Sequence, residues 1–137
     1  MTYAFFARKP GLIPAYQALE SAIAENFPDT TVCIQKSQLS FYASCGYATV
    51  SMPPWRAAPG EFFILTVYLP YPASSPRIFA RSEPAPNRYT HHIPITKTED
   101  VDAEIIQWLT DAHGFACARK GRPHLGEIPI TQIHQKE

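Results

Sequence analysis

The sequence predicts an α+β fold: a single domain with a largely antiparallel β-sheet of about five to six strands, and with an N-terminal and a C-terminal helix packed on one face. A length of 137 residues fits one domain. Apolar residues recur with helical period near each end of the chain, and the stretch between changes to short segments of period two. Short connections between those segments favour antiparallel pairing, and this arrangement is typical of α+β domains.

The first helix is predicted from Ile13 to Phe27. Pro14 lies near the first turn, where its missing N–H costs little, and Pro28 ends the helix. Apolar residues at spacings of four, three, four and four share one helical face. They are Leu12, Tyr16, Leu19, Ile23 and Phe27.

Short segments rich in β-branched and aromatic residues follow and are predicted as strands. The unbroken apolar run at 62–69 indicates burial on both faces or a central position in the sheet. The candidate strands are 30–35, 39–44, 47–52, 62–69, 77–80 and 90–95. Proline-rich stretches at 53–60, 70–76 and 82–89 are predicted to be long, stiff loops.

The second helix is predicted to begin at Thr98, a good N-cap residue followed by acidic side chains in the first turn. Gly114 is placed to cap its C-terminus. The domain is therefore expected to span residues 1–117. Residues 118–137 contain several glycines and prolines, and they are expected to form a loosely ordered tail or one docked through its isoleucines.

Charge and cysteine content narrow the class of protein. Twelve lysines and arginines balance twelve aspartates and glutamates, which argues against nucleic acid as the main partner. No apolar run reaches the roughly 18–20 residues of a membrane span, and the N-terminus lacks the charge pattern of a secretory signal. The chain has three cysteines, Cys33, Cys45 and Cys117. Their odd number and wide spacing indicate reduced thiols and not a set of disulfide bonds. We therefore expect a cytoplasmic protein without membrane contact.

Several short pieces of sequence occur in a characteristic order. They are residues 5–10, 16–19, 36–41, 46–48, 75–77, 83–86, 91–93, 102–104 and 108–109. In this order they resemble an uncharacterised family of small bacterial domains with a Lys-Ser-Gln strand, a His-His strand and a closing acidic helix. The resemblance covers roughly residues 5–115 and implies one cytoplasmic α+β domain, with no activity attached. Members often have a basic run where this chain has Tyr42-Ala43-Ser44-Cys45.

A basic segment and a polar turn supply the candidate ligand-binding residues. Residues 77–97 carry four basic side chains and one acidic side chain. Lys36, placed at the mouth of a pocket with Arg77 and Arg88, would bind a carboxylate or a phosphate. The alternatives are an ordinary polar turn at Lys36 and a structural salt bridge from Arg77 to Glu83 or Asp102. The candidate residues are Lys36, Gln38, Arg77, Arg88, His91 and His92.

The adjacent residues His91 and His92 point to opposite faces of a strand, so they cannot easily share one metal ion. A metal site would need one of them with partners such as His113, Cys45 or Asp111, and no recognised ligand spacing joins these residues. One histidine could instead be buried and hydrogen-bonded while the other is exposed, or one could bind a polar ligand or act as a general base. We expect no metal, no cofactor and no catalytic residue.

These observations predict a binding or interaction module for a small anionic ligand or a partner protein, either monomeric or homodimeric. An enzymatic role is the less favoured interpretation. One alternative is a hydrolase-like enzyme with a histidine general base, or with Cys45 as nucleophile beside His91 or His92. A weak nucleic-acid binder that uses the dense aromatic residues for stacking is the other alternative.

Overall fold

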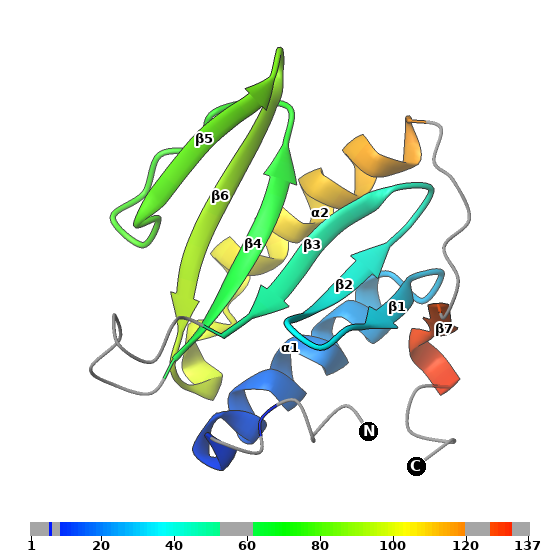
Figure 1. The fold of residues 1–137 in the computed structure, drawn as a ribbon, viewed down its shortest axis with the longest axis vertical. Coiled ribbons are helices and arrows are strands. Elements are labelled where there is room, and N and C mark those ends of the chain that lie inside the picture. Colours follow the sequence, from blue (N-terminus) through cyan, green and yellow to red (C-terminus); the bar gives the residue numbers. More distant parts are fainter. Residues whose placement is uncertain (1–5, 7–8, 53–61, 120–126, 133–137) are drawn as a thin grey trace.

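Two helices cover one face of a twisted antiparallel sheet in the computed structural model (Figure 1). The structure describes residue 6 and residues 9–52, 62–119 and 127–132. Helix α1 spans Ile13–Asn26 and follows a 3-10 turn at Pro10–Leu12, while helix α2 spans Ala103–Cys117. The predicted α+β class, with two helices and one antiparallel sheet, is confirmed.

The sheet has seven strands in the order β5-β6-β4-β3-β2-β1-β7, and every neighbouring pair is antiparallel. The strands are β1 Thr31–Ile34, β2 Gln38–Tyr42, β3 Gly46–Ser51, β4 Phe63–Leu69, β5 Ala80–Ala85, β6 Arg88–Ile95 and β7 Glu127–Pro129. After β4 the chain crosses to the outer edge to form β5, and β6 returns beside β4. The prediction of five to six strands is therefore wrong.

The additional strand is β7, which comes from the segment predicted as a tail. Val32 of β1 pairs with Ile128, and Ile130 in the following 3-10 turn, Ile130–Gln132, is 3 % exposed. A three-residue strand is too short to show an alternating pattern in the sequence, so only its pairing partner reveals it.

The segment predicted as a loop at 82–89 is instead a β-hairpin formed by β5 and β6. Ala85 pairs with Arg88, and the turn between them contains Asn87 at a φ of 62°, a conformation that asparagine tolerates. Pro84 is accepted because β5 is an edge strand, whose outward positions need no ladder donor. The strand predicted at 77–80 is accordingly displaced along the chain.

Both predicted ends of the second helix are also displaced. Thr98–Asp100 forms a separate 3-10 turn, and Asp102 is the N-cap of α2 because its Oδ1 accepts a hydrogen bond from the backbone N–H of Ile105 at 3.2 Å. The helix continues through Gly114 to Cys117. Packing of Ala112 and Ala116, both nearly inaccessible to solvent, outweighs the poor helix propensity of one glycine.

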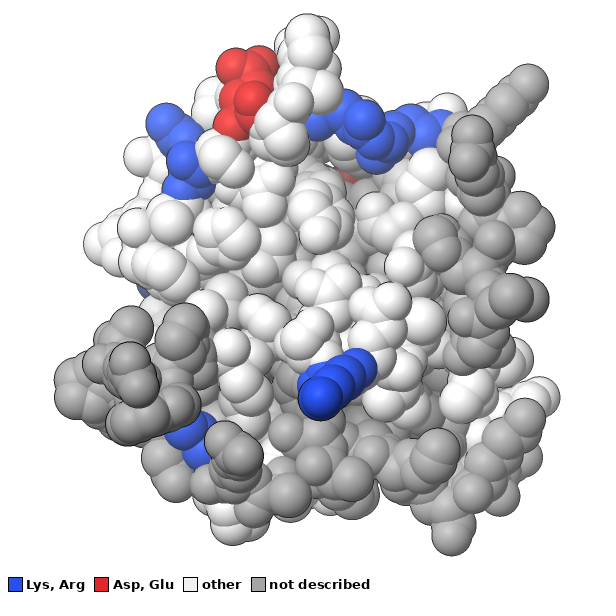
Figure 2. Space-filling model, viewed as in Figure 1, with Lys and Arg blue, Asp and Glu red and all other residues white. Residues whose placement is uncertain are grey.

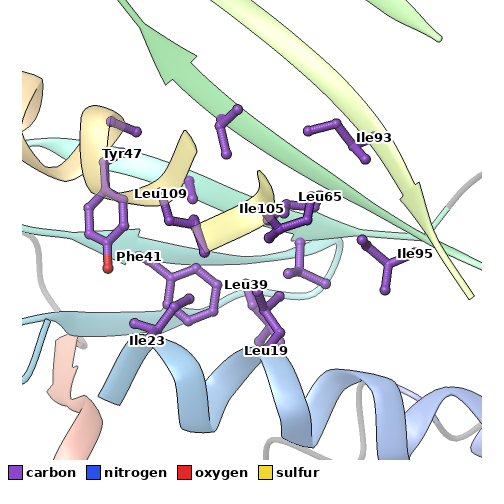
Figure 3. Close-up of a cluster of buried hydrophobic side chains, with 14 of the residues drawn as sticks. Leu19, Ile23, Leu39, Phe41, Tyr47, Leu65, Ile93, Ile95, Ile105 and Leu109 are labelled. Atoms are coloured by element: carbon purple, nitrogen blue, oxygen red, sulfur yellow. The ribbon is translucent and has the colours of Figure 1, made fainter. Parts of the chain in front are cut away.

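The core lies between the helices and the sheet (Figure 3). Leu19 and Ile23 of α1 and Leu109 of α2 point toward the sheet, and all three are fully buried. Their partners on the sheet include Leu39, Phe41, Leu65, Ile93 and Ile95. These side chains alternate along their strands, which leaves the intervening residues for the other face of the sheet.

Tyr47 enters this core through a β-bulge. Tyr42 pairs with Gly46 and Phe41 pairs with Ala48, so Tyr47 is the extra residue on β3. Its side chain is fully buried, and its hydroxyl group lies 2.7 Å from the Oγ1 atom of Thr30, which is also buried. The bulge therefore places the hydroxyl group of Tyr47 within hydrogen-bonding distance of the hydroxyl group of Thr30.

The opposite face of the sheet carries small hydroxyl side chains. Strand register places Ser40, Thr49, Thr66 and His92 in one row across β2, β3, β4 and β6. Figure 2 shows this face to be largely uncharged in its centre apart from one basic side chain, with one more basic group at its lower left and several basic groups and one acidic group along its upper rim. Most of the charged side chains in this view thus lie at one end of the sheet.

Candidate functional site

A cavity of about 430 Å³ lies at that end of the sheet, and we call it the hairpin cavity. It is bounded by the β2–β3 turn, the end of β4, the β5–β6 hairpin and the last turns of α2 (Figure 1). Four aromatic side chains and two arginines dominate its lining: Tyr42, Tyr68, Tyr89, Phe115, Arg88 and Arg119. Four separate segments of the chain therefore build one concave site.

The aromatic wall depends on close packing at the β2–β3 turn. A Cβ atom at Gly46 would lie 3.1 Å from Cε1 of Tyr42, so glycine allows the tyrosine ring to lie against the backbone. On the helix side, the guanidinium carbon of Arg119 lies 5.1 Å from the ring centroid of Phe115, a cation–π distance. The cavity thus combines flat apolar surfaces with a charged group that is already placed against one of them.

Arg88 and Arg119 give the cavity its charge. No aspartate or glutamate is among the described residues that line it. Among the described residues, neither arginine takes part in an ion pair. Figure 2 shows basic side chains along the rim between the tip of the β5–β6 hairpin and the end of α2. Two guanidinium groups without a carboxylate partner can bind a carboxylate or phosphate through charge-assisted hydrogen bonds.

The residues proposed from the sequence do not come together at one site. Arg88 lines the hairpin cavity at the start of β6. Lys36 is exposed in the β1–β2 turn, at the end of the sheet opposite to Tyr42 and the cavity. Gln38, at the beginning of β2, donates a hydrogen bond from Nε2 to Oγ of Ser40 at 3.1 Å. Lys36 and Gln38 therefore cannot act on a ligand that Arg88 holds.

Arg77 makes the structural salt bridge that the sequence left as an alternative. Its Nη1 atom lies 2.8 Å from Oδ1 of Asp102 and 3.3 Å from Oε1 of Glu104. Its Nη2 atom donates a hydrogen bond to the backbone carbonyl of Asp100 at 2.6 Å. The guanidinium group thus ties the segment before β5 to the N-terminal turn of α2.

His91 and His92 face opposite sides of β6. His91 is fully buried beneath the sheet, and its Nε2 accepts a hydrogen bond from the backbone N–H of Ala73 at 2.9 Å. Nδ1 of His92 lies 2.9 Å from Oγ1 of Thr66 on the open face. Burial lowers the pKa of both histidines. His91 therefore has no route to an external substrate, and neither histidine lines the hairpin cavity.

A second polar cluster lies where the C-terminal turns of α2 meet the segment after α1. Nε2 of His113 lies 3.1 Å from each carboxylate oxygen of Asp29, and Sγ of Cys117 lies 3.8 Å from both ring nitrogens of His113. One potential ligand atom from each residue lies within 4.8 Å of the others. These three residues, unlike His91 and His92, have the proximity that a metal site requires.

Sequence reasoning missed Phe115, Arg119 and Cys117 as site residues. The predicted helix end at Gly114 removed Phe115 and Cys117 from α2, although the apolar pattern continues to Ala116. Arg119 follows the end of α2 and lies in the segment that was predicted as a tail. With the helix extended by one turn, His113 and Cys117 stand four residues apart on one face, and this spacing was the signal available in the sequence.

Comparison with protein families identifies the domain. The model of a family described as a domain of unknown function, DUF5655, matches residues 3–116. The chain belongs to this family. The DUF5655 match spans α1, strands β1 to β6 and nearly all of α2, so the resemblance to an uncharacterised family of small domains is confirmed. Comparisons with curated proteins and with solved structures give no match. No described helix is long and apolar enough to cross a membrane.

Proposed function

We propose that this domain binds a small anionic ligand with a planar apolar part in the hairpin cavity. The observation that carries the proposal is the pairing of Arg88 and Arg119 at a cavity of about 430 Å³ whose described lining holds no carboxylate. The volume lies within the range of roughly 300–1,000 Å³ typical of small-molecule sites.

The lining indicates which chemical features the ligand should have. Arginine side chains form paired hydrogen bonds with carboxylate or phosphate oxygens, so either group could occupy the charged end of the cavity. Tyr42, Tyr68 and Phe115 provide flat surfaces on which an aromatic ring could stack. A concave site of this size favours a small molecule over the acidic segment of a partner protein, which would need a longer groove.

The experiment is an NMR titration of the 15N-labelled domain with phenyl phosphate, which carries both a phosphate and an aromatic ring. Phenol serves as the uncharged analogue. We expect saturable shifts in the amide signals of the β2–β3 turn and the β5–β6 hairpin, and much weaker binding of phenol. Loss of one charge-assisted hydrogen bond costs about 1.5–3 kcal/mol, so R88A and R119A should each weaken binding roughly 10- to 100-fold.

K36A is the matched control, since Lys36 is an exposed cation at the opposite end of the sheet. Equal binding of phenyl phosphate by the wild type and by a folded R88A/R119A double variant would contradict the proposal. Absence of binding to the wild-type domain would also do so. Tighter, arginine-dependent binding of an acidic peptide would instead move the assignment to a partner protein.

A further inference from the structure

Asp29, His113 and Cys117 form a cluster that the hairpin cavity does not use. His113 and Cys117 lie four residues apart on α2, and Asp29 lies between α1 and β1. Phe115 of α2 and Arg119, just after the helix, thus line the cavity, whereas His113 and Cys117 of the same helix lie beside Asp29. We propose that Asp29, His113 and Cys117 bind a divalent transition-metal ion, with zinc as the best match.

The spacing of the three side chains agrees with tetrahedral coordination. Zinc bonds of about 2.0 Å to nitrogen or oxygen and about 2.3 Å to sulfur imply ligand separations of about 3.3 Å for N···O and about 3.5 Å for N···S. The corresponding distances are 3.1 Å between His113 and Asp29 and 3.8 Å between His113 and Cys117. The ligand atoms of Asp29 and Cys117 lie within 4.8 Å of each other, compared with about 3.5 Å for O···S in a tetrahedral site. Metal binding would draw these two exposed side chains toward each other.

Packing of the His113 ring restricts where its nitrogens can point. Phe27 stacks on the imidazole with ring centroids 4.7 Å apart and an interplanar angle of 21°. Tyr47 contacts it edge-on at 5.3 Å. The side chain of His113 is 18 % exposed, whereas that of Asp29 is 57 % exposed. The site is thus held by aromatic rings on one side and open on the other, where a water molecule could complete the coordination.

The ligand types select the metal. Thiolate and imidazole ligands favour zinc and similar transition metals, whereas magnesium and calcium prefer oxygen ligands alone. Three protein ligands with an open fourth position are typical of zinc sites that bind a water molecule or substrate.

A Cys-His-Asp nucleophile is the competing explanation, and the geometry disfavours it. The sulfur of Cys117 is equidistant from both ring nitrogens of His113, so it is not aimed at either lone pair. A thiolate beside the carboxylate of Asp29 needs a compensating positive charge, and a bound metal ion supplies it.

The experiment is a titration of the reduced domain with Co²⁺, whose absorption reports both thiolate ligation and tetrahedral geometry. We expect one equivalent of Co²⁺ to bind, with a sulfur-to-metal charge-transfer band that added Zn²⁺ abolishes. C117S should remove that band, and H113Q and D29N should weaken Zn²⁺ binding in a chelator competition. The loss should exceed the roughly 10- to 100-fold cost of removing an outer-shell partner.

C45S is the matched control, since Cys45 is a partly buried thiol outside the cluster. It should keep the charge-transfer band, and so should R88A/R119A, which separates this proposal from the hairpin cavity. Circular dichroism verifies that each variant is folded. No band in the folded, reduced wild type would overturn the proposal, as would a band that persists unchanged in C117S or disappears equally in C45S.

Discussion

Replacing Arg77 with alanine removes a clamp between the segment before β5 and the start of α2. The side chain of Arg77 is 22 % exposed, whereas its carboxylate partners Asp102 and Glu104 are 49 % and 45 % exposed. Each exposed pair contributes about 0.2–1 kcal/mol. The charge-assisted hydrogen bond to the carbonyl of Asp100, at 2.6 Å, contributes about 1.5–3 kcal/mol when it is shielded from water.

Because part of this network is hydrated, we expect R77A to lower the free energy of unfolding by about 2 kcal/mol. Urea unfolding followed by circular dichroism measures this difference. R77K is the matched variant, since lysine keeps the charge but cannot reach two carboxylates and a carbonyl with one planar group. It should recover less than half of the loss.

The cost of R77A should also depend on pH. Burial raises the pKa of Asp102, but hydrogen bonds from Arg77 and from the backbone N–H of Ile105 outweigh it and hold that pKa below its usual value. A depressed carboxyl pKa contributes stability above the unfolded pKa of about 3.9, and this contribution is lost as pH falls through the folded pKa. The cost should therefore be smaller at pH 3 than at pH 7. If R77A lowers the free energy of unfolding by less than about 0.5 kcal/mol at pH 7, or if R77K recovers all of the loss, this reasoning is refuted.

Two further predictions concern buried polar groups. Burial lowers the pKa of His91, so the unfolded chain takes up a proton at higher pH than the folded one, and stability should fall as pH drops below about 6.5. Urea unfolding at several pH values should show a shallower fall in H91Q, and a slope equal to that of the wild type would contradict this. Y47F leaves the Thr30 hydroxyl buried without its partner and should cost about 1–3 kcal/mol in urea unfolding. Y47F/T30V should recover part of that loss, and a double variant less stable than Y47F would count against it.

Periodicity in the sequence was enough to predict the centre of the fold. Residues 13–27 have a helical repeat, and four alternating or apolar segments correspond to β1 through β4 within one or two residues at most ends. These elements pack on the core from one face, so their apolar residues carry a clear pattern. The helices and strands followed from that pattern, and the antiparallel pairing followed from the short connections between the strands.

Proline and glycine misled the prediction at the periphery. Pro84 and Pro86 indicated a loop, but an edge strand and its turn accept them. Gly114 indicated a helix end, but the helix continues through it because Ala112 and Ala116 on either side are packed in the core. Local signals of this kind are weak wherever tertiary packing supplies the missing stability.

The same errors hid both candidate sites. Arg88 was predicted as a possible anion-binding residue, but Arg119, which lines the same cavity, lies after α2 in the segment that was predicted as a tail. Asp29 and His113 are far apart in the chain, and only the packing of α2 against the turn after α1 brings them within 3.1 Å. Such a pair cannot be predicted from spacing along one sequence, because no periodic pattern links the two residues.

The two edge strands of the sheet affect how readily the domain aggregates at high concentration. β7 has only three residues and ends at Pro129, and β5 combines Pro84 with the charged side chains of Arg81 and Glu83 and an irregular register. Short length, proline and charge all discourage a further strand from joining a sheet. Chains of this domain should therefore not stack edge to edge into fibrils. Substituting Pro84 and Glu83 by β-branched residues would remove two features of β5, the longer edge strand, that prevent edge pairing.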